Sequence, residues 1–377
     1  MHEALDPRVF HKQARTLAAA GFEVHLLARH ERDEVREGVS IHALPEPRSR
    51  WGRPAQWARL AWQTWRLRPR VIHIHDPELL PLLLLGRLTG AATVYDAHEY
   101  YGEEIARRAW IPRPLRRPVA RLTELVETFV ARRIDAVVAV NEHMAAGFRR
   151  GGARAVAVHN FPPAEYFDSD RPLDTRDPPS PQPSPARGEG ADRGDAPTTQ
   201  SSVLSPQSSV VGYVGLLSPD RGLATVYEAA CLLRQRLPEA GVRVIGRVDW
   251  SGLPASVPRD PAAWAAAGVE LAGTIPADAV PAALDQIAVG WIPFRDTGNN
   301  RRTIPLKLLE YMAAGKPVVA SAIGFIATIV RESGCGVLVP PDDPAAHAVA
   351  LAALLADPKE QQRLGAAGRM ASRTRYT

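Results

Sequence analysis

The sequence predicts an α/β protein of two domains, each a parallel sheet covered by helices, and three observations support this fold class. The chain has 377 residues, which is too long for one ordinary α/β core and fits two domains of typical size. Short β-rich runs alternate with helix-length stretches in both halves, as in parallel sheets with crossover helices. A stretch nearly without large apolar residues separates the halves. We therefore expect two Rossmann-like domains.

In the first half, runs of β-branched and apolar residues predict five strands, with helices in the gaps. The strands are expected at residues 22–27, 71–75, 92–95, 136–140 and 155–159. Residues 168–209 are crowded with Pro, Ser, Gly and charge, and such a segment buries too little surface to offset its ordering entropy. We expect a disordered linker or insertion there, between an N-terminal domain, 1–167, and a C-terminal domain, 210–377.

The second half repeats the alternation and predicts six more strands. These are expected at residues 210–214, 242–245, 269–271, 289–292, 317–320 and 336–339. Parallel sheets bind ligands in the loops that follow the carboxyl ends of their strands. The chemistry of this protein is therefore expected in loops that directly follow strands.

Composition excludes several other classes. Apolar residues make up 45% of the chain and charged residues 23%, so neither global disorder nor a fibrous repeat is indicated. The two cysteines, Cys231 and Cys335, lie far apart, which argues against a disulfide framework and against a zinc site. No apolar run reaches the roughly 18 residues that span a bilayer, and no leader-like N-terminus is present. A cytoplasmic protein is expected, soluble or peripheral at the inner membrane surface.

The net charge of +5 is concentrated in the N-terminal half, where residues 1–160 hold 25 Lys and Arg against 18 Asp and Glu. The excess lies in two stretches that also contain tryptophan, residues 48–70 with Trp51, Trp57, Trp62 and Trp65, and residues 107–121 with Trp110. Arg beside Trp suits an anionic membrane surface. A solvated arginine face explains the pattern equally well, and both interpretations stay open. Nucleic acid is not expected as a partner, because no binding motif accompanies the charge.

The most informative stretch is residues 304–321, IPLKLLEYMAAGKPVVAS. Pro305 suits the first turn of a helix, Gly315 ends that helix, and a buried strand follows. Lys307 and Glu310 lie three residues apart and project from one side near the helix N-terminus. A helix N-terminus with an adjacent lysine suits a diphosphate, and the carboxylate can accept hydrogen bonds from ribose hydroxyls. The alternative is a surface ion pair without function.

A second signal is the stretch 210–223, VVGYVGLLSPDRGL. A buried strand is followed by Gly215, where the chain turns closely past a ligand, and Arg221 and Gly222 then lead into a helix. The alternative is a glycine turn with a solvated arginine.

Polar side chains also follow two predicted strands of the first half. Asp96, His98 and Glu99 come after the strand at 92–95, and His75 and Asp76 come at the end of the strand at 71–75. An acceptor or a reacting group would be contacted at such strand ends. The alternative for each histidine is a structural role.

These motifs resemble those of glycosyltransferase family 4. The stretch 304–321 resembles the family's P-x-K-x-x-E-Y-M-A-x-G-x-P-V-V run, which is far more specific than a lone glycine loop. The stretch 210–223 resembles the family's Y-x-G-x-L…[KR]-G loop. The D-A-H-E string at 96–99 resembles the family's segment that contains a histidine facing the donor sugar. The D-P-R-V-F-H-K string at 6–12 resembles the family's opening helix. The resemblance spans nearly all of the chain except the linker. It implies the GT-B fold, in which two Rossmann-like domains face each other across a cleft.

The resemblance also implies site residues. The catalytic residues are expected to be His98, Arg221 and Lys307. The donor is expected to be bound by a wider set, namely Gly215, Arg221, Asn299, Asn300, Lys307 and Glu310. The acceptor side is expected to comprise His75, Asp76, Asp96 and Glu99. Relatives of this family need no metal or other cofactor, and no Asp-x-Asp pair occurs near the predicted donor site.

Three departures from the family pattern stand out. Arg302 occupies the place of the first glutamate of an E-x7-E pattern, where Asn299 and Asn300 would substitute, and Leu216 stands where many relatives have an arginine. Relatives also begin with a strand ahead of the opening helix, and they continue beyond the position of Thr377. The resemblance therefore predicts that the first, central strand is missing and that the chain is truncated at both ends.

The expected function is that of a retaining glycosyltransferase of the hexosyltransferase type. It would move a sugar from a UDP- or GDP-sugar to a glycan or lipid-linked acceptor in cell-surface polysaccharide biosynthesis. Two alternatives stay open. A nucleotide-sugar epimerase of the same fold would change the donor sugar without an acceptor, and a decayed fragment would bind nucleotide weakly or not at all.

Overall fold

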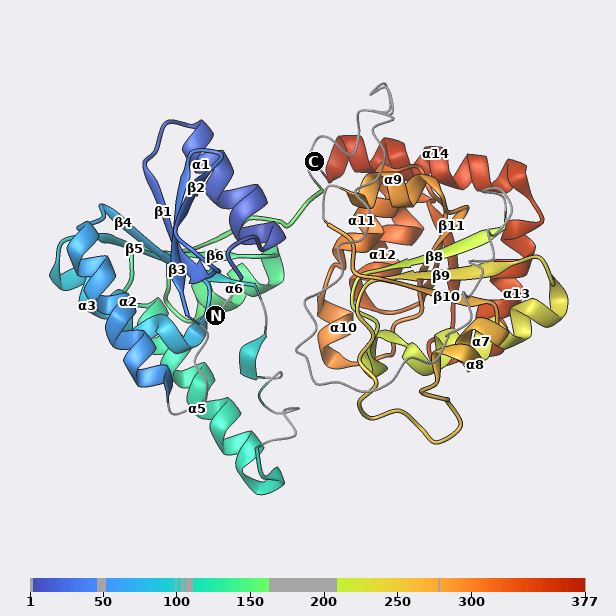
Figure 1. Cartoon of the computed structure of the whole chain (residues 1–377), viewed down its shortest axis with the longest axis horizontal. Coiled ribbons are helices and arrows are strands. Elements are labelled where there is room, and N and C mark those ends of the chain that lie inside the picture. Colours follow the sequence, from blue (N-terminus) through green and yellow to red (C-terminus); the bar gives the residue numbers. More distant parts are fainter. Residues whose placement is uncertain are drawn as a thin grey trace, which may run out of the picture. The chain divides into compact units, whose positions relative to one another are not determined.

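The computed structural model describes residues 3–45, 52–98, 100–102, 105, 111–162, 209–276 and 279–376. The chain forms two compact units, Met1–Phe161 with Arg301–Thr303, and Pro162–Asn300 with Ile304–Thr377. Figure 1 shows both units, and each is described below by itself. The linker predicted at 168–209 lies outside the described residues except for Ser209.

In the part of the first unit that the structure describes, the strands form two sheets. One has the order β1-β3-β2, with β1 (Val24–Arg29) parallel to β3 (Val39–Leu44) and β2 (Glu34–Arg36) antiparallel to it. The other has the order β4-β5-β6-β7 and is parallel throughout, with β4 (Val71–Ile74), β5 (Ala92–Ala97), β6 (Ala136–Ala139) and β7 (Ala155–Ala157). All five strands expected in this half are present.

Two strands of the first unit were not predicted, namely β2 and β3. Strand β2 has three residues and is largely exposed, so its sequence has no apolar run. It pairs with β3 through a tight turn at Glu37 and Gly38, which have φ of 50° and 80°. Two successive residues with positive φ fit the twist of a two-residue hairpin. The antiparallel pairing therefore follows from the turn and not from a strand-length apolar pattern.

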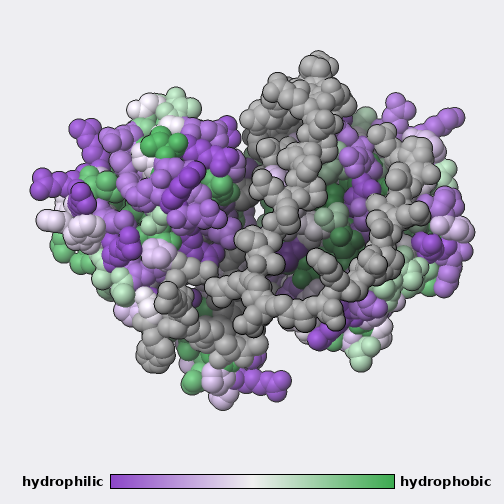
Figure 2. Space-filling model, viewed as in Figure 1, coloured by the Kyte–Doolittle hydropathy of each residue, from purple (hydrophilic) through white to green (hydrophobic). Residues whose placement is uncertain are grey.

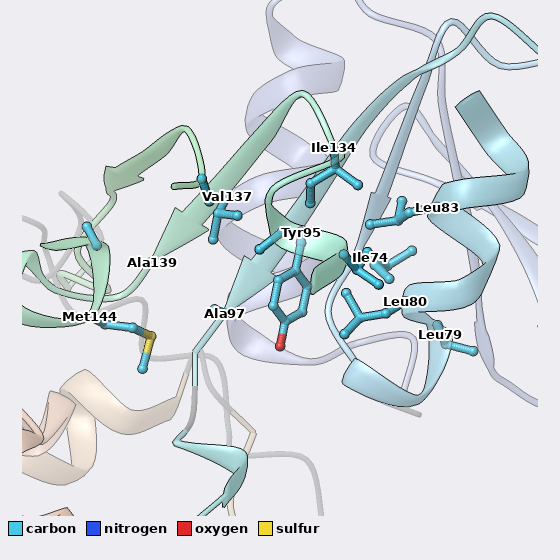
Figure 3. Close-up of a cluster of buried hydrophobic side chains, with 14 of the residues drawn as sticks. Ile74, Leu79, Leu80, Leu83, Tyr95, Ala97, Ile134, Val137, Ala139 and Met144 are labelled. Carbon is cyan, nitrogen blue, oxygen red and sulfur yellow. The ribbon is translucent and has the colours of Figure 1, made fainter. Parts of the chain in front are cut away.

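Helices of the first unit cover these sheets. Their bounds are η1 (Pro7–Ala14), α1 (Arg15–Ala19), α2 (Arg53–Leu67), η3 (Pro77–Leu79), α3 (Leu80–Leu88), α5 (Arg113–Ala131) and α6 (Glu142–Arg150). Figure 3 shows the main core cluster, in which Tyr95 of β5 lies among apolar side chains of β4, β6 and α3. The Tyr95 hydroxyl donates to Glu127 Oε1 of α5 at 2.6 Å, so the buried phenol keeps a hydrogen-bond partner.

In the described part of the second unit, six strands form one parallel sheet in the order β10-β9-β8-β11-β12-β13. The strands are β8 (Val210–Val214), β9 (Gly241–Ile245), β10 (Val269–Gly273), β11 (Val289–Ile292), β12 (Val318–Ser321) and β13 (Gly336–Val339). All six strands expected in this half are present. The first strand of the unit, β8, lies beside the fourth, β11. The strand order thus reverses between β8 and β11, which makes that gap the topological switch point of the sheet.

The helices of this half complete the Rossmann-like alternation. They are η5 (Pro219–Arg221), α7 (Leu223–Arg236), α8 (Pro261–Ala266), α9 (Val280–Asp285), α10 (Gly298–Arg302), α11 (Leu306–Ala313), α12 (Gly324–Ser333), α13 (Pro344–Leu355) and α14 (Pro358–Arg375). Pro305 is the residue before α11, with an extended ψ of 129°, and not part of its first turn as predicted. Among the described residues, no helix is both long and apolar enough to cross a membrane.

Asp-Pro pairs start five of the described helices, and in four of them the aspartate also caps the helix. Before η1, α8, α13 and α14, an aspartate side chain accepts a hydrogen bond from a backbone N–H of the first turn, and proline follows it; the aspartates are Asp6, Asp260, Asp343 and Asp357. The carboxylate satisfies an otherwise unpaired donor, and proline has no N–H to leave unpaired. These helix starts are therefore encoded locally in the sequence.

Candidate functional site

The residues predicted for the donor site meet in the second unit at the switch point between β8 and β11. Gly215 follows β8 directly, and its φ is +96°. A Cβ added to Gly215 would lie 3.7 Å from Lys307 Nζ, so the lysine ammonium sits against the backbone of this turn. Ligands of doubly wound sheets bind at this position.

Two further glycines allow the strand ends to approach this turn. Gly246, after β9, has φ +141°, and a Cβ there would lie 2.3 Å from the Gly215 carbonyl oxygen. Gly222, before α7, has φ +84°, and a Cβ there would lie 1.8 Å from the Pro293 carbonyl oxygen. Any side chain at either glycine would collide with backbone, so these glycines set the close spacing of the loops around Lys307.

Lys307 is almost fully buried, with 6% of its surface exposed, although it is a lysine near the start of α11. Its ammonium lies 3.4 Å from the centre of the Tyr213 ring and 5.3 Å from that of Phe294. Nζ has no hydrogen-bond partner in the part of the chain that the structure describes. Burial, and then the nearby Arg221 charge, lower the pKa of Lys307 well below its usual range, while Glu310 acts in the opposite direction. The site thus holds a buried cation that lacks an anionic hydrogen-bond acceptor.

Arg221 and Glu310 also belong to the set predicted for the donor site. Arg221 ends η5, and its Nη1 donates to the Leu216 carbonyl oxygen at 3.5 Å while its guanidinium carbon lies 5.9 Å from the Phe294 ring centre. Glu310 is 8% exposed and lies one turn after Lys307 on α11. The structure therefore brings together four of the predicted donor residues, with two cations on one side of the switch point.

The two predicted asparagines lie on α10. Asn300 is 5% exposed, and both hydrogens of its amide donate to backbone oxygens, to Asp220 at 2.8 Å and to Arg295 at 2.9 Å. These bonds join the loop after β11 to the turn that holds Arg221. The Asn300 amide group is therefore committed to positioning this loop. Asn299 precedes it on the same helix.

In the first unit, Asp96 at the end of β5 is the centre of a polar cluster. Its side chain is fully buried, and Arg8 donates to both carboxylate oxygens, from Nη2 at 2.9 Å to Oδ1 and from Nε at 3.2 Å to Oδ2. Gln13 also donates to Oδ2. Burial by itself would raise the pKa of Asp96, but the Arg8 guanidinium more than offsets this and holds the pKa below its usual value. Asp96 therefore anchors η1 through Arg8 and Gln13.

Three histidines surround this carboxylate. His73 Nε2 lies 3.9 Å from Asp96 Oδ2, His75 Nδ1 lies 3.6 Å from the same oxygen, and His98 Nδ1 lies 4.0 Å from Oδ1. The rings of His73 and His75 are stacked with centres 4.8 Å apart. Burial lowers the pKa of His73, which Asp96 opposes and Arg8 reinforces. The three imidazoles thus lie around the carboxylate at the carboxyl ends of β4 and β5.

The first unit also contains a set of side chains with the geometry of a metal site. Within the described ranges, His73, His75 and Asp96 offer ligand atoms that all lie within 4.8 Å of one another. Arg8 already contacts both carboxylate oxygens, and a cation in this set would face that guanidinium. The residues therefore fit a divalent ion poorly.

Of the residues predicted for the acceptor side, His75 and Asp96 lie together, and His98, predicted as catalytic, lies beside them. Asp76 comes two residues after the end of β4, and Glu99 lies outside the described residues. Sequence reasoning missed the role of Arg8, although it is part of the D-P-R-V-F-H-K stretch. It also missed His73, which lies two residues before His75 and so on the same face of the strand.

Two family models match the chain. Residues 7–164 match the glycosyl transferase 4-like domain, and residues 208–357 match glycosyl transferases group 1. The first matched segment contains the strands of the first unit, and the second contains the strands of the second unit. Together the two segments cover most of the chain.

Relatives with curated names support the same assignment. The chain is 33% identical over 184 residues to the D-inositol 3-phosphate glycosyltransferase of Salinispora arenicola, covering 46% of this chain and 39% of the relative. It is 27% identical over 311 residues to the GDP-mannose-dependent alpha-(1-6)-phosphatidylinositol monomannoside mannosyltransferase of Mycolicibacterium smegmatis, covering 80% of this chain and 73% of the relative. The chain spans only 18% to 39% of the length of four relatives that have the first of these names.

Solved structures show the same fold. Sucrose-phosphate synthase of Thermosynechococcus elongatus superposes with a TM-score of 0.68 at 18% identity, covering 99% of this chain and 90% of that one. HepE of Anabaena, in complex with UDP and glucose, superposes with a TM-score of 0.65 at 14% identity, covering all of this chain and 94% of that one. At these identities the likeness concerns the fold.

Proposed function

The chain belongs to the group 1 glycosyltransferases with the GT-B fold, and on this basis we propose that it transfers a sugar from a nucleotide-diphosphate sugar. The donor is a UDP- or GDP-sugar bound by the second unit. The acceptor is a glycan or a lipid-linked glycan bound by the first unit, and the anomeric configuration of the sugar is retained. The product belongs to cell-surface polysaccharide biosynthesis.

The observation that best supports a diphosphate donor is the buried ammonium of Lys307. It has no hydrogen-bond acceptor in the described part of the chain, its pKa is lowered by burial and by Arg221, and it lies at the switch point beside Gly215. An anion placed here would gain two charge-assisted interactions and would remove the cost of the unpaired lysine. A diphosphate is negatively charged and long enough to contact both Lys307 and Arg221. The turn at Gly215 has no side chain and leaves room for it.

The same two cations suit the proposed chemistry. As the bond between the anomeric carbon and the diphosphate oxygen breaks, negative charge develops on the leaving diphosphate, and Lys307 and Arg221 stabilise it. The acceptor hydroxyl forms the new bond to the anomeric carbon, and its proton passes to an oxygen of the leaving diphosphate. We place His98 against the donor sugar and Glu310 against the ribose hydroxyls. Because protein side chains supply the positive charge, the reaction needs no metal ion, and a chelator such as EDTA should leave the rate unchanged.

The nucleotide is proposed from two proteins that the chain resembles. The mannosyltransferase of M. smegmatis is named as GDP-mannose-dependent, and HepE was solved with UDP and glucose. The comparisons therefore support a nucleotide-sugar donor and leave UDP and GDP as the two candidates to test.

A peripheral contact between the first unit and an anionic membrane surface is also proposed. Six large apolar residues of α5 are exposed at spacings of three and four, which places them on one side of the helix: Leu115, Val119, Leu122, Leu125, Val126 and Phe129. The smaller Ala120 and Ala131 are on the buried side. Four arginines lie on the same helix, at 113, 116, 117 and 121. An apolar face bordered by arginines is typical of helices that lie in a lipid interface.

Tryptophans of α2 extend this surface pattern. Trp57, Trp62 and Trp65 are 37%, 54% and 62% exposed, while Trp51 and Trp110 lie outside the described residues. Figure 2 shows hydrophobic and hydrophilic side chains intermingled over the visible face of this unit. Sedimentation with vesicles tests the proposal. Binding to phosphatidylglycerol vesicles at low salt should fall strongly in a Leu122→Gln/Leu125→Gln variant and stay unchanged in Met370→Gln, an equally exposed apolar site of the second unit. Equal binding by all three proteins would reject α5 as the contact.

The experiment that tests the donor site is a thermal-shift screen against UDP, GDP, ADP and their common sugar conjugates. Binding to the folded state alone raises stability by RT ln(1 + [L]/Kd), or about 2.7 kcal/mol at a hundredfold excess over Kd. The shift should occur with UDP or GDP and be lost in Lys307→Met and Arg221→Gln. Lys359→Met and Arg236→Gln, at exposed positions of the same unit, serve as matched controls.

An acceptor-free assay separates transfer from epimerisation. An epimerase changes the configuration of the donor sugar without any acceptor, whereas a transferase leaves the donor intact or hydrolyses it slowly. A clear melt with no response to any nucleotide would instead indicate a fold that has lost its site.

A further inference from the structure

The ladder between β8 and β11 is shorter than the strands that form it. In the sheet that the structure describes, β8 pairs with β9 along its whole length of five residues. It pairs with β11 at two positions, Val211 with Val289 and Gly212 with Gly290. The pairing of β8 with β11 therefore stops before the carboxyl end of β8, which leads directly into the turn at Gly215.

The hydroxyl of Tyr311 takes the next place in this ladder. In a parallel strand, the backbone groups of one residue point to one neighbouring strand and those of the next residue to the other. The Gly215 N–H donates to the Ile245 carbonyl oxygen of β9 at 2.7 Å, so the Val214 N–H points to the β11 side. That N–H donates to Tyr311 Oη at 3.0 Å, and the Tyr311 hydroxyl donates to the Gly212 carbonyl oxygen at 3.1 Å. A side chain of α11 thus occupies the position of the next backbone bond between β8 and β11.

The ring of Tyr311 reaches this position because its neighbour on β11 has no side chain. A Cβ added to Gly290 would lie 2.4 Å from two carbons of the Tyr311 ring. Tyr311 is fully buried. Burial raises the pKa of its hydroxyl well above the usual range, and the backbone N–H groups of Val214 and Trp291 act in the opposite direction. The phenol is therefore neutral and lies between backbone groups of both strands.

Tyr311 also joins the helix that contains Lys307 to the strand end that Lys307 contacts. Lys307 lies four residues before Tyr311 on α11, which is about one helical turn. On β8, the centre of the Tyr213 ring lies 3.4 Å from Lys307 Nζ, and the Tyr213 hydroxyl donates to the Leu216 carbonyl oxygen at 2.8 Å. Tyr213 lies between the two residues of β8 that bond to Tyr311. The position of the Tyr213 ring under the ammonium thus depends on the bonds that Tyr311 makes.

We propose that Tyr311 is a positioning residue of the donor site, which holds β8 and β11 apart at the switch point and keeps Lys307 against the turn at Gly215. This role rests on the proposed function, since it concerns the place where the diphosphate of the donor binds. The hydroxyl lies inside the fold, so it acts on the nucleotide only through the backbone of β8 and through α11. Without it, the Val214 N–H would be buried without a partner, and β8 and β11 would shift to pair it.

Isothermal titration calorimetry with UDP and GDP tests this role. Tyr311→Phe removes the hydroxyl and keeps the ring. Its Kd for the nucleotide that the natural protein binds should rise by at least about tenfold, because small displacements of binding groups weaken contacts that depend on their spacing. The matched control is Tyr227→Phe, which removes the hydroxyl of a partly buried tyrosine of α7 that packs on Trp264. Its Kd should stay within about twofold of the natural value.

A second control separates positioning from stability. Leu354→Ala empties part of the core of the same unit and should lower the melting temperature at least as much as Tyr311→Phe. At a temperature where both variants are folded, Leu354→Ala should bind the nucleotide with the natural Kd. Amide exchange gives a local measurement, because the Val214 N–H should exchange roughly a hundredfold faster in Tyr311→Phe than in the natural protein.

Four outcomes would overturn the inference. An unchanged Kd in Tyr311→Phe, with faster exchange at Val214, would make the hydroxyl a purely structural group and leave the proposed function intact. An equal rise of Kd in Leu354→Ala would attribute the effect to stability. Failure of Tyr311→Phe to fold would make the hydroxyl a requirement of the sheet itself. If the natural protein binds neither nucleotide, the proposed function fails first, and no donor site remains for Tyr311 to position.

Discussion

Replacing Lys307 by methionine should stabilise the ligand-free protein and abolish its response to nucleotide. Methionine keeps the straight side chain and removes the charge. Lys307 is 6% exposed, its Nζ faces the Tyr213 ring at 3.4 Å, and it has no hydrogen-bond acceptor among the described residues. The substitution therefore removes a buried cation without leaving a partner unsatisfied.

The expected gain follows from two opposing effects. Replacing buried ionic groups by apolar residues of similar volume stabilises proteins by about 1 to 4 kcal/mol. The lost cation–π contact offsets about 0.5 to 2 kcal/mol of this gain. A net gain of about 1 to 2 kcal/mol remains, which corresponds to a rise of about 2 to 8 °C in the melting temperature of a domain of this size.

The pH dependence of stability provides a second test of the same prediction. The pKa of Lys307 is lowered in the folded state, so the unfolded chain binds the proton more tightly. Between the folded pKa and the ordinary lysine value, the stability of the natural protein therefore rises with pH. Below the folded pKa, Lys307 is charged in both states, and the full free-energy cost of burying its charge is present. Lys307→Met should lack this rise, so the two stability curves should converge toward high pH.

Differential scanning calorimetry with and without UDP or GDP measures both effects. The natural protein should melt lower than Lys307→Met without ligand and higher at a hundredfold excess of the correct nucleotide over its Kd. Lys359→Met should match the natural protein in both conditions. If Lys307→Met melts several degrees lower than the natural protein without ligand, the ammonium is a structural cation held by the aromatic rings. The inference of a site awaiting an anion would then be wrong.

Three further predictions concern buried titratable groups. Asp96→Asn leaves the Arg8 guanidinium without its carboxylate, so the free energy of unfolding of the first unit, measured in urea, should fall by about 3 to 5 kcal/mol. Arg15→Gln breaks an exposed ion pair and should lower it by less than about 1 kcal/mol. Burial raises the pKa of Glu127 to about 7. The free energy of unfolding should therefore fall by up to about 3 kcal/mol as pH rises from about 4.5 to 7, and Glu127→Gln should remove this dependence on pH. Burial lowers the pKa of His347 to about 4, so the second unit should lose stability as pH falls from about 6.5 to 4; a pH-independent melt of the second unit over that range would contradict the burial of this imidazole.

Most of the fold could be predicted because its strands are runs of apolar, often β-branched residues. Strand β8, Val-Val-Gly-Tyr-Val, is buried at every position, and such a run identifies itself without knowledge of its neighbours. Strand β2 could not be found in this way, since its three residues are largely exposed and its pairing depends on the turn at Glu37 and Gly38. Local patterns thus revealed most of the buried strands. They missed β2, which depends on a turn, and also its half-buried partner β3.

The sequence named the residues predicted for the donor site, but it could not give their burial or their contacts. The spacing of Lys307 and Glu310 placed both on one side of α11, and the structure agrees with this. That Lys307 is buried against Tyr213 and Phe294 depends on where two separate strands end. The roles of Arg8 and His73 were missed for the same reason, because Arg8 meets Asp96 across 88 residues of sequence.

Each unit holds a buried charged side chain near the carboxyl end of a strand, Asp96 within β5 and Lys307 of α11 beside the turn that follows β8. The two charges are compensated differently. Asp96 receives donors from Arg8 and Gln13, so its charge is satisfied within the fold. Lys307 Nζ has no hydrogen-bond acceptor among the described residues. It lies instead against an aromatic ring and near the Arg221 charge. A satisfied buried charge stabilises one arrangement of the chain, whereas an unsatisfied one is costly unless a ligand completes it. This difference favours the second unit as the place where an anionic substrate binds, because only there does a buried charge lack a partner among the described residues.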